Sequence, residues 1–96
     1  MKSWVLYIIE CADGTLYTGI TNDLKKRLLA HNDGTGAKYT RGRGPVKLRY
    51  AEKCEDHSHA LRRECYIKKL SRDEKQLLCK QANLKEFYEC NTSSIQ

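Results

Sequence analysis

A run of apolar and aromatic residues close to the N-terminus, residues 4–9, constrains the fold more than any other feature of the sequence. Both alternating faces of this run are apolar, which is typical of a strand that is covered on two sides. The dipeptide Asp13-Gly14, a strong signal for a tight hairpin turn, follows soon after it. Residues 16–20 are then expected to return antiparallel to the first strand. The chain is therefore predicted to begin with a hairpin whose first strand lies in the centre of a sheet.

The next part of the chain predicts a helix, a loop and a third strand. Residues 23–32 have a helical pattern, with Thr21 or Asn22 available as the N-cap. Residues 34–45 contain four glycines and the proline of the chain, and this composition predicts a loop. Residues 46–54 alternate apolar and basic side chains, which predicts an edge-like strand with Val46, Leu48 and Tyr50 on one face.

Two further helices are predicted after this strand. The first begins at Asp56 or Ser58 and extends through Leu70, with Leu61 and Cys65 in its apolar stripe. The second begins with a capping box, Ser71-x-x-Glu74, and places leucines 77, 78 and 84 on its apolar side. The resulting order is β-β-α-β-α-α. A hairpin followed by helices predicts a small α+β domain with an antiparallel sheet.

The length and composition are those of one globular domain. Ninety-six residues leave too little chain for two cores, so residues 1–85 are expected to form the domain and 86–96 a flexible polar tail. The longest apolar run is far shorter than the about 18 residues of a membrane span, and it is also too short for a signal peptide. A cytoplasmic protein with no membrane partner is the resulting expectation.

The positive charge is concentrated in one part of the chain. The net charge is +6, and residues 17–50 hold eight Lys and Arg side chains against two acidic ones. The rest of the chain is balanced, so the excess forms one contiguous basic patch. Such a patch favours a polyanionic partner such as nucleic acid, although a solvated basic face gives the same composition.

Five cysteines, an odd number without a C-x-x-C pair, predict reduced and mostly buried thiols. A zinc site built from Cys54, His57, His59 and Cys65 is the alternative, because Cys54-x-x-His57 has a plausible spacing for two ligands. Structural zinc sites usually show two well-spaced ligand pairs, and here the two histidines lie two residues apart.

Three placements of polar residues have both a structural and a functional interpretation. Glu64 falls inside the apolar stripe of its helix, where it is either a salt-bridge partner of an arginine or a metal ligand or catalytic acid. Arg27 and His31, four residues apart, share one helix face that is either solvated or suited to an anionic substrate. Tyr7 and Tyr17 lie on neighbouring strands, as core residues or as phosphate-binding or proton-transferring phenols.

Read together, these segments resemble the GIY-YIG nucleases. Val5-Leu6-Tyr7 and Tyr17-Thr18-Gly19 resemble the two tripeptides that name the family. The segments 24–32 and 60–64 resemble its helices with an essential arginine and a metal-binding glutamate. Residues 36–45 resemble a loop of the short stand-alone, YhbQ/YazA-like branch. In this sequence Val5 and Leu6 replace Gly-Ile, and Ile20 stands where some members have a lysine.

The resemblance implies a fold, an activity and a set of site residues. The fold is a three-stranded antiparallel sheet flanked by helices, and the activity is metal-dependent endonucleolytic cleavage of DNA. Tyr17 would be the general base or position the water, and Tyr7 would orient the nucleophile and the scissile phosphate. Arg27 would neutralise the phosphate, supported by His31, and Glu64 would hold one Mg²⁺ or Mn²⁺.

Nucleic acid is the expected partner, and DNA is favoured over RNA. The more specific expectation is a structure-selective endonuclease of DNA repair or recombination. The basic loop and the strand after it are the expected binding surface, with these residues: Lys38, Tyr39, Arg41, Arg43, Lys47 and Arg49. Tyr39 either stacks on an unpaired base or packs under the loop. The alternative functions are a non-catalytic nucleic-acid-binding or adaptor module with the nuclease fold, and a zinc-dependent interaction module.

Overall fold

The computed structural model describes residues 3–33 and 45–82. Three strands form one antiparallel sheet in the order β2-β1-β3: β1 (Trp4–Glu10), β2 (Leu16–Thr21) and β3 (Lys47–Cys54). Three helices complete the fold: α1 (Leu24–Asp33), α2 (His57–Lys68) and α3 (Arg72–Gln81). The predicted α+β class, the element order β-β-α-β-α-α and the central position of the first strand are confirmed.

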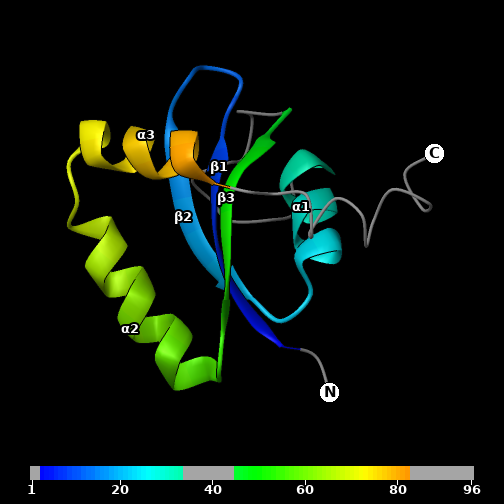
Figure 1. The fold of residues 1–96 in the computed structure, drawn as a ribbon. Helices are drawn as coiled ribbons and strands as arrows, with labels where there is room; N and C mark the ends of the chain where they lie inside the picture. Colours follow the sequence, from blue (N-terminus) through cyan, green and yellow to red (C-terminus); the bar gives the residue numbers. More distant parts are fainter. Residues whose placement is uncertain (1–2, 34–44, 83–96) are drawn as a thin grey trace.

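The helices lie on both sides of the sheet (Figure 1), and each side has its own apolar core. On the α1 side the core includes Val5, Tyr7, Ile9, Leu24 and Leu48. On the α2 and α3 side it includes Leu6, Ile8, Ala60, Ile67 and Cys79. Every second residue of β1 thus belongs to the same core, which is why the first strand is apolar at every position.

The hairpin and the helix starts follow from local sequence. Gly14 has a φ of 86°, a conformation that a glycine adopts without strain, and the Asp13 carboxylate accepts hydrogen bonds from the Thr15 backbone and hydroxyl. Asp56 caps α2, one of the two predicted N-caps. Ser71 and Glu74 form the predicted capping box of α3.

The N-cap of α1 differs from the prediction. The Asp23 carboxylate accepts a hydrogen bond from the Lys26 backbone N–H, so Asp23 caps the helix. Thr21 supports the turn before the cap, because its hydroxyl accepts from the Asp23 N–H at 3.0 Å. At the other end of α1, Asn32 accepts from the Val46 N–H at 2.7 Å and so connects this helix to the start of β3.

The prediction that Leu48 and Tyr50 share a face of the third strand is wrong. The pairing of β1 with β3 is shifted between Ile8 and Ile9, so that Tyr50 is opposite Ile8 and Leu48 is opposite Ile9. Because successive residues of β1 face opposite sides, Leu48 packs on the α1 side and Tyr50 on the other. Arg49 is the extra residue at this β-bulge.

The apolar stripe of α2 is narrower than predicted. Ala60 and Ile67 are buried, whereas Leu61 is 45% exposed and Cys65 is also exposed. Leu77 of α3, 54% exposed, likewise lies outside the core, and Leu78 is partly buried against it. No helix within residues 3–33 and 45–82 is long and apolar enough to cross a membrane. The predicted tail, 86–96, lies outside the described residues.

Candidate active site

Tyr7 is the centre of a polar cluster between β1 and α1. Its side chain is fully buried, and its hydroxyl lies 2.9 Å from Nε2 of His31. The same hydroxyl oxygen accepts a hydrogen bond from Nε of Arg27 at 3.4 Å. One phenol from the central strand is therefore held between two side chains of α1.

The spacing of Arg27 and His31 along α1 places both at Tyr7. The two residues are four apart, so both project from one face of the helix, as predicted. His31 is 1% exposed, which makes the solvated-face interpretation wrong for this residue. Arg27 is partly exposed, so the cluster opens toward solvent at the arginine.

Tyr17 brings β2 into the same cluster. Its ring centroid lies 6.5 Å from that of Tyr7 and 5.4 Å from that of His31, the latter in an edge-on arrangement. Tyr17 also interacts with Arg27, whose pKa is raised mainly by the hydrogen bond to Tyr7 and additionally by Tyr17. The predicted pairing of the two tyrosines on one face of the sheet is what the structure shows.

Gly19 is part of this arrangement and was not predicted as a site residue. It is the cross-strand partner of Tyr7, and a Cβ atom at this position would lie 2.6 Å from the Tyr7 hydroxyl oxygen. The same Cβ would lie 3.1 Å from Cε2 of Tyr17. A glycine inside a strand often marks such a close approach, and this signal is present in the sequence. Gly19 therefore provides the space that both phenols occupy.

The electrostatics of the cluster favour a neutral histidine. Burial, and secondly the Arg27 charge, lower the pKa of His31 below its usual value. Burial raises the pKa of Tyr7. The hydrogen bond and charge of Arg27 offset part of this rise, and the charges of Tyr17 and Glu64 add to it. Because Tyr7 already accepts from Arg27, we assign its hydroxyl hydrogen to the bond with Nε2, with neutral His31 as the acceptor.

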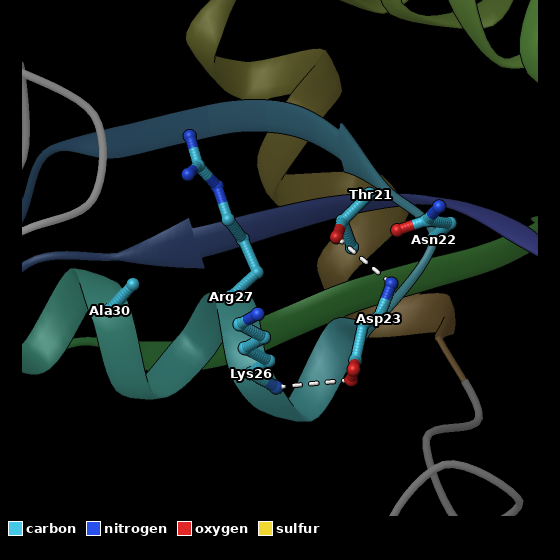
Figure 2. Close-up of a pocket in the computed structure, with 6 residues that line it drawn as sticks. All are labelled: Thr21, Asn22, Asp23, Lys26, Arg27 and Ala30. Carbon is cyan, nitrogen blue, oxygen red and sulfur yellow. Dashed lines mark hydrogen bonds between the residues drawn. The ribbon is translucent and has the colours of Figure 1, made fainter.

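Arg27 also lines an open pocket on the outer side of the cluster. The pocket has a volume of about 260 Å³ and lies where β2 passes into α1 (Figure 2). It is lined by Thr21, Asn22, Asp23, Lys26, Arg27 and Ala30. The Arg27 guanidinium thus belongs both to the buried cluster of Tyr7 and His31 and to the lining of an open pocket.

Glu64 belongs to α2, which packs on the opposite side of the sheet from the core that contains Tyr7. It lies between Ala60 and Ile67 on the inward stripe of the helix, and its side chain is 21% exposed. Its charge raises the pKa of Tyr7 in addition to the larger effect of burial, so the two groups interact electrostatically. Its ion-pair partner is Lys68 at 3.4 Å, whereas the predicted partner was an arginine.

The donor set at Glu64 fits a magnesium-type ion. Mg²⁺ is usually held in proteins by one or two carboxylates, with water and substrate phosphate oxygens as the remaining ligands. A single half-buried carboxylate such as that of Glu64 is compatible with this ligand set. A site for zinc is different, because the residues 54, 57, 59 and 65 are not brought together: no group of three or more His, Cys, Asp or Glu side chains suited to a metal occurs in the described part of the chain.

The four cysteines within the described ranges are free thiols. Cys11, Cys54 and Cys79 are buried, as predicted, and Cys65 is exposed. Burial raises the pKa values of Cys54 and Cys79, so these two thiols are less readily ionised than usual. The fifth, Cys90, lies outside the described residues.

Two of the six residues of the predicted basic surface, Lys47 and Arg49, belong to the described part of the chain. Lys38, Tyr39, Arg41 and Arg43 lie outside the described residues. Lys47 is exposed at the start of β3. The remaining residue, Arg49, pairs with Glu10 at 3.6 Å and lowers the pKa of Cys79 of α3 against the larger effect of burial, so it is directed to the opposite side of the sheet from Tyr7.

Comparisons with known proteins show which family the chain resembles. Residues 3–77 match the family model of the GIY-YIG catalytic domain. The chain is 57% identical over 81 residues to UPF0213 protein CPE1444 of Clostridium perfringens, covering 84% of this chain and 87% of that protein. It is 56% identical over 73 residues to UPF0213 protein VNG_2274C of Halobacterium salinarum, covering 76% and 95%.

A solved structure shows the same fold. The solution NMR structure of the protein EF2693 from E. faecalis superposes with a TM-score of 0.58 at 43% identity, covering 83% of this chain and 85% of that one. The matched segment contains both tyrosines, Arg27, His31 and Glu64. The chain therefore belongs to the GIY-YIG family, and its relatives within that family are the UPF0213 proteins.

Proposed function

We propose that this protein is an endonuclease that uses one Mg²⁺ or Mn²⁺ ion to hydrolyse DNA phosphodiester bonds. Membership of the GIY-YIG catalytic-domain family supports a nuclease-type function. The observation that carries the proposal is the state of Arg27. It is held by a neutral phenol beside a neutral histidine, and no salt bridge joins it to a carboxylate within the described ranges. Its charge is therefore available to an anionic substrate.

Phosphodiester hydrolysis requires three things that this cluster can supply. The negative charge of the phosphate must be offset, and the planar guanidinium of Arg27 is suited to this task. The attacking water must be positioned, which we assign to Tyr17. A proton must also be removed from that water, although a phenol with a pKa near 10 is a weak base at neutral pH.

The contact between Tyr7 and His31 offers a route for this proton. As the water oxygen bonds to phosphorus, its proton passes to the Tyr7 oxygen while the Tyr7 hydroxyl proton moves to Nε2 of His31. The bond between phosphorus and the leaving oxygen then breaks, the leaving oxygen takes up a proton from solvent, and His31 returns its proton to solvent. The 2.9 Å separation suits the second transfer, and the lowered pKa of His31 keeps the acceptor neutral beforehand. Tyr7 and His31 would thereby transfer the proton, while Arg27 offsets the charge of the phosphate.

Glu64 is the residue proposed to hold the divalent ion. When bound, such an ion stabilises negative charge on the leaving oxygen and activates water. The Glu64 carboxylate would contribute the protein ligand, since it is half-buried and interacts electrostatically with Tyr7. Lys68 pairs with it in the absence of the ion and would be displaced toward solvent, where half of its side chain already lies.

The basic patch supports a nucleic-acid substrate, and we assign DNA over RNA. Within this patch, the basic loop and the strand after it would contact the substrate through Lys38, Tyr39, Arg41, Arg43, Lys47 and Arg49. Arg49 contributes least, because Glu10 compensates its charge on the far side of the sheet. Contacts of this kind bind phosphates without reading bases, which suits recognition of a DNA structure such as a flap or junction and a role in repair or recombination.

A non-catalytic nucleic-acid-binding module is the second candidate. The pair between Glu64 and Lys68 favours it, because an intrahelical partner gives the carboxylate a structural use. The two candidates differ in whether phosphodiester bonds are cleaved.

A metal-titrated cleavage assay on single-stranded, duplex, flap and junction DNA tests the proposal. We expect cleavage with Mg²⁺ or Mn²⁺, loss with chelator, and a fall of at least about 100-fold in Glu64→Gln, the scale of several kcal/mol of lost charge stabilisation. DNA binding by this variant should persist or tighten. Lys68→Gln is the matched control, since it breaks the same ion pair and keeps the carboxylate.

Three outcomes decide between the candidates. Loss of cleavage in Glu64→Gln but not in Lys68→Gln, at unchanged melting temperatures, supports a metal ligand. Full activity of a stably folded Glu64→Gln protein overturns the metal assignment. Tight DNA binding by the wild-type protein without cleavage of any substrate overturns the enzyme and supports the binding module.

A further inference from the structure

The pocket beside Arg27 has features that the proposed reaction does not use. It lies outside the cluster of Tyr7 and His31, at the passage from β2 into α1 (Figure 2). Its volume of about 260 Å³ is smaller than the roughly 300–1,000 Å³ of small-molecule sites, and five of its six lining residues have polar or charged side chains. The size and lining suit a single phosphate group or sugar-phosphate unit and not an apolar ligand.

The charges around the pocket favour an anion. Lys26 and Arg27 are neighbouring cations in the lining, and Asp23 is the single carboxylate among the six lining residues. That carboxylate caps α1 through the Lys26 N–H at 3.2 Å, and Figure 2 shows it directed at the helix backbone. The affinity for an anion would thus come from side chains, with the amide of exposed Asn22 as a further hydrogen-bond donor.

Arg27 connects this pocket to the reacting centre. Its Nε donates to Tyr7 and the guanidinium also interacts with Tyr17, which still leaves N–H groups for phosphate oxygens, because a guanidinium has five of them. A group in the pocket and the phosphate that the cluster would bind are therefore both neighbours of Arg27. In a nucleic-acid strand, the next phosphate along the backbone is the group at that position.

We propose that this pocket binds the backbone phosphate next to the scissile one, with Lys26 as its principal ligand and Asn22 as a secondary one. The inference rests on the proposed function, since it takes the cluster of Tyr7 and Arg27 as the place of the scissile phosphate. Lys26 acts as a point charge, so this subsite adds salt-dependent affinity and orients the strand without reading sequence.

The test compares Lys26→Gln with Lys25→Gln. Both lysines are exposed and adjacent on α1, but Lys25 does not line the pocket. Binding of a short DNA is measured in chelator over a series of salt concentrations, so that no cleavage is required. We expect Lys26→Gln to reduce the slope of log K against log salt by about 1, as for the loss of one phosphate contact, and Lys25→Gln to leave it unchanged.

A neutral methylphosphonate, placed in turn at each linkage of the DNA, locates the contact. At one linkage, the methylphosphonate should weaken binding by the wild-type protein and have no further effect on binding by Lys26→Gln. In a DNA that is cleaved, this linkage should lie next to the cut. Equal slopes for the two lysine variants, or no coupled linkage, overturn the subsite. Coupling in a DNA that is never cleaved keeps the subsite and overturns the enzyme.

A competition arm separates backbone phosphate from free phosphate. Inorganic phosphate is added at constant ionic strength, with chloride as the reference anion. Strong competition that depends on Lys26, without any coupled linkage in the DNA, would assign the pocket to a free phosphate and overturn the proposal.

Discussion

Two clusters of tyrosine and arginine lie on opposite sides of the same sheet, and they differ in whether the arginine is paired with a carboxylate. On the α1 side, Tyr7 of β1 contacts Arg27. On the α2 side, Tyr50 of β3 lies with Arg63 at the Glu52 carboxylate. Each pairs a strand tyrosine with a helix arginine. The presence of the carboxylate in the second cluster separates the two.

The Glu52 carboxylate compensates the charge of Arg63 within the second cluster. Arg63 donates to both Glu52 oxygens at 2.8 and 2.9 Å, and the Tyr50 hydroxyl donates to the same group at 2.7 Å. Burial and the Glu52 hydrogen bond raise the pKa of Tyr50 to about 12. The arginine of the first cluster has a longer contact, 3.4 Å, to a neutral phenol. A compensated arginine stabilises the fold, whereas an uncompensated one can bind an external anion.

The largest expected effect is on catalysis, in Arg27→Gln. Removal of a preorganised donor from the phosphate should lower single-turnover cleavage by about 10²–10³-fold. The melting temperature should change little, because the hydrogen bond to Tyr7 is long and partly exposed. Cleavage kinetics and circular dichroism on the same samples measure both quantities. Arg63→Gln is the matched control, with cleavage per folded molecule near that of the wild type; equal losses in both variants would contradict the comparison.

The next effect is on stability, in Arg63→Met. This change removes two charge-assisted hydrogen bonds and leaves Glu52 partly buried without its cation, which should cost about 1.5–3 kcal/mol in the free energy of unfolding. Urea denaturation measures this cost. The double variant E52Q/R63M should recover part of the loss, because the unpaired charge is gone. A double variant less stable than the single one would show that the hydrogen bond from Tyr50 to the Glu52 carboxylate outweighs the cost of the unpaired charge.

The smallest expected effect is the dependence of stability on pH. The two clusters should lose their contributions to stability in different pH ranges. The folded pKa of His31 is lowered by burial and Arg27, so the unfolded chain binds the proton more readily. Its contribution is present above about pH 6.5 and is lost as the pH falls toward the folded pKa. Burial by itself would raise the pKa of Glu52. The hydrogen bonds from Arg63 and Tyr50 lower this pKa more strongly, so its value in the folded protein lies below 4.5.

Glu52 thus contributes stability that is lost in a more acidic window, as the pH falls from about its unfolded pKa through its folded one. Urea midpoints measured from pH 8 to pH 3 show both windows. His31→Gln should flatten the first window and Glu52→Gln the second. A first window that persists in His31→Gln would show that this histidine does not have the buried, neutral state that the proton route requires.

Much of the fold was predictable because its signals are local. The apolar run 4–9, the Asp13-Gly14 turn and the capping box at Ser71 each act over a few residues, and all three appear where predicted. The helical spacing of Arg27 and His31 likewise placed them on one face. The identity of the N-cap of α1 was wrong, since Thr21, Asn22 and Asp23 are all competent caps and only the turn geometry selects one.

The sequence by itself determined the element order, the hairpin and the residue types of the candidate site, because spacing along one strand or helix decides which side chains share a face. The tertiary structure decided which groups meet across elements. The bulge at Arg49 sends Leu48 and Tyr50 to opposite cores, and the missing Cβ of Gly19 gives Tyr7 its place. The pairing of Arg63 with Glu52, and not with Glu64, is equally non-local. Such contacts depend on the register and packing of segments far apart in the chain, which no local pattern encodes.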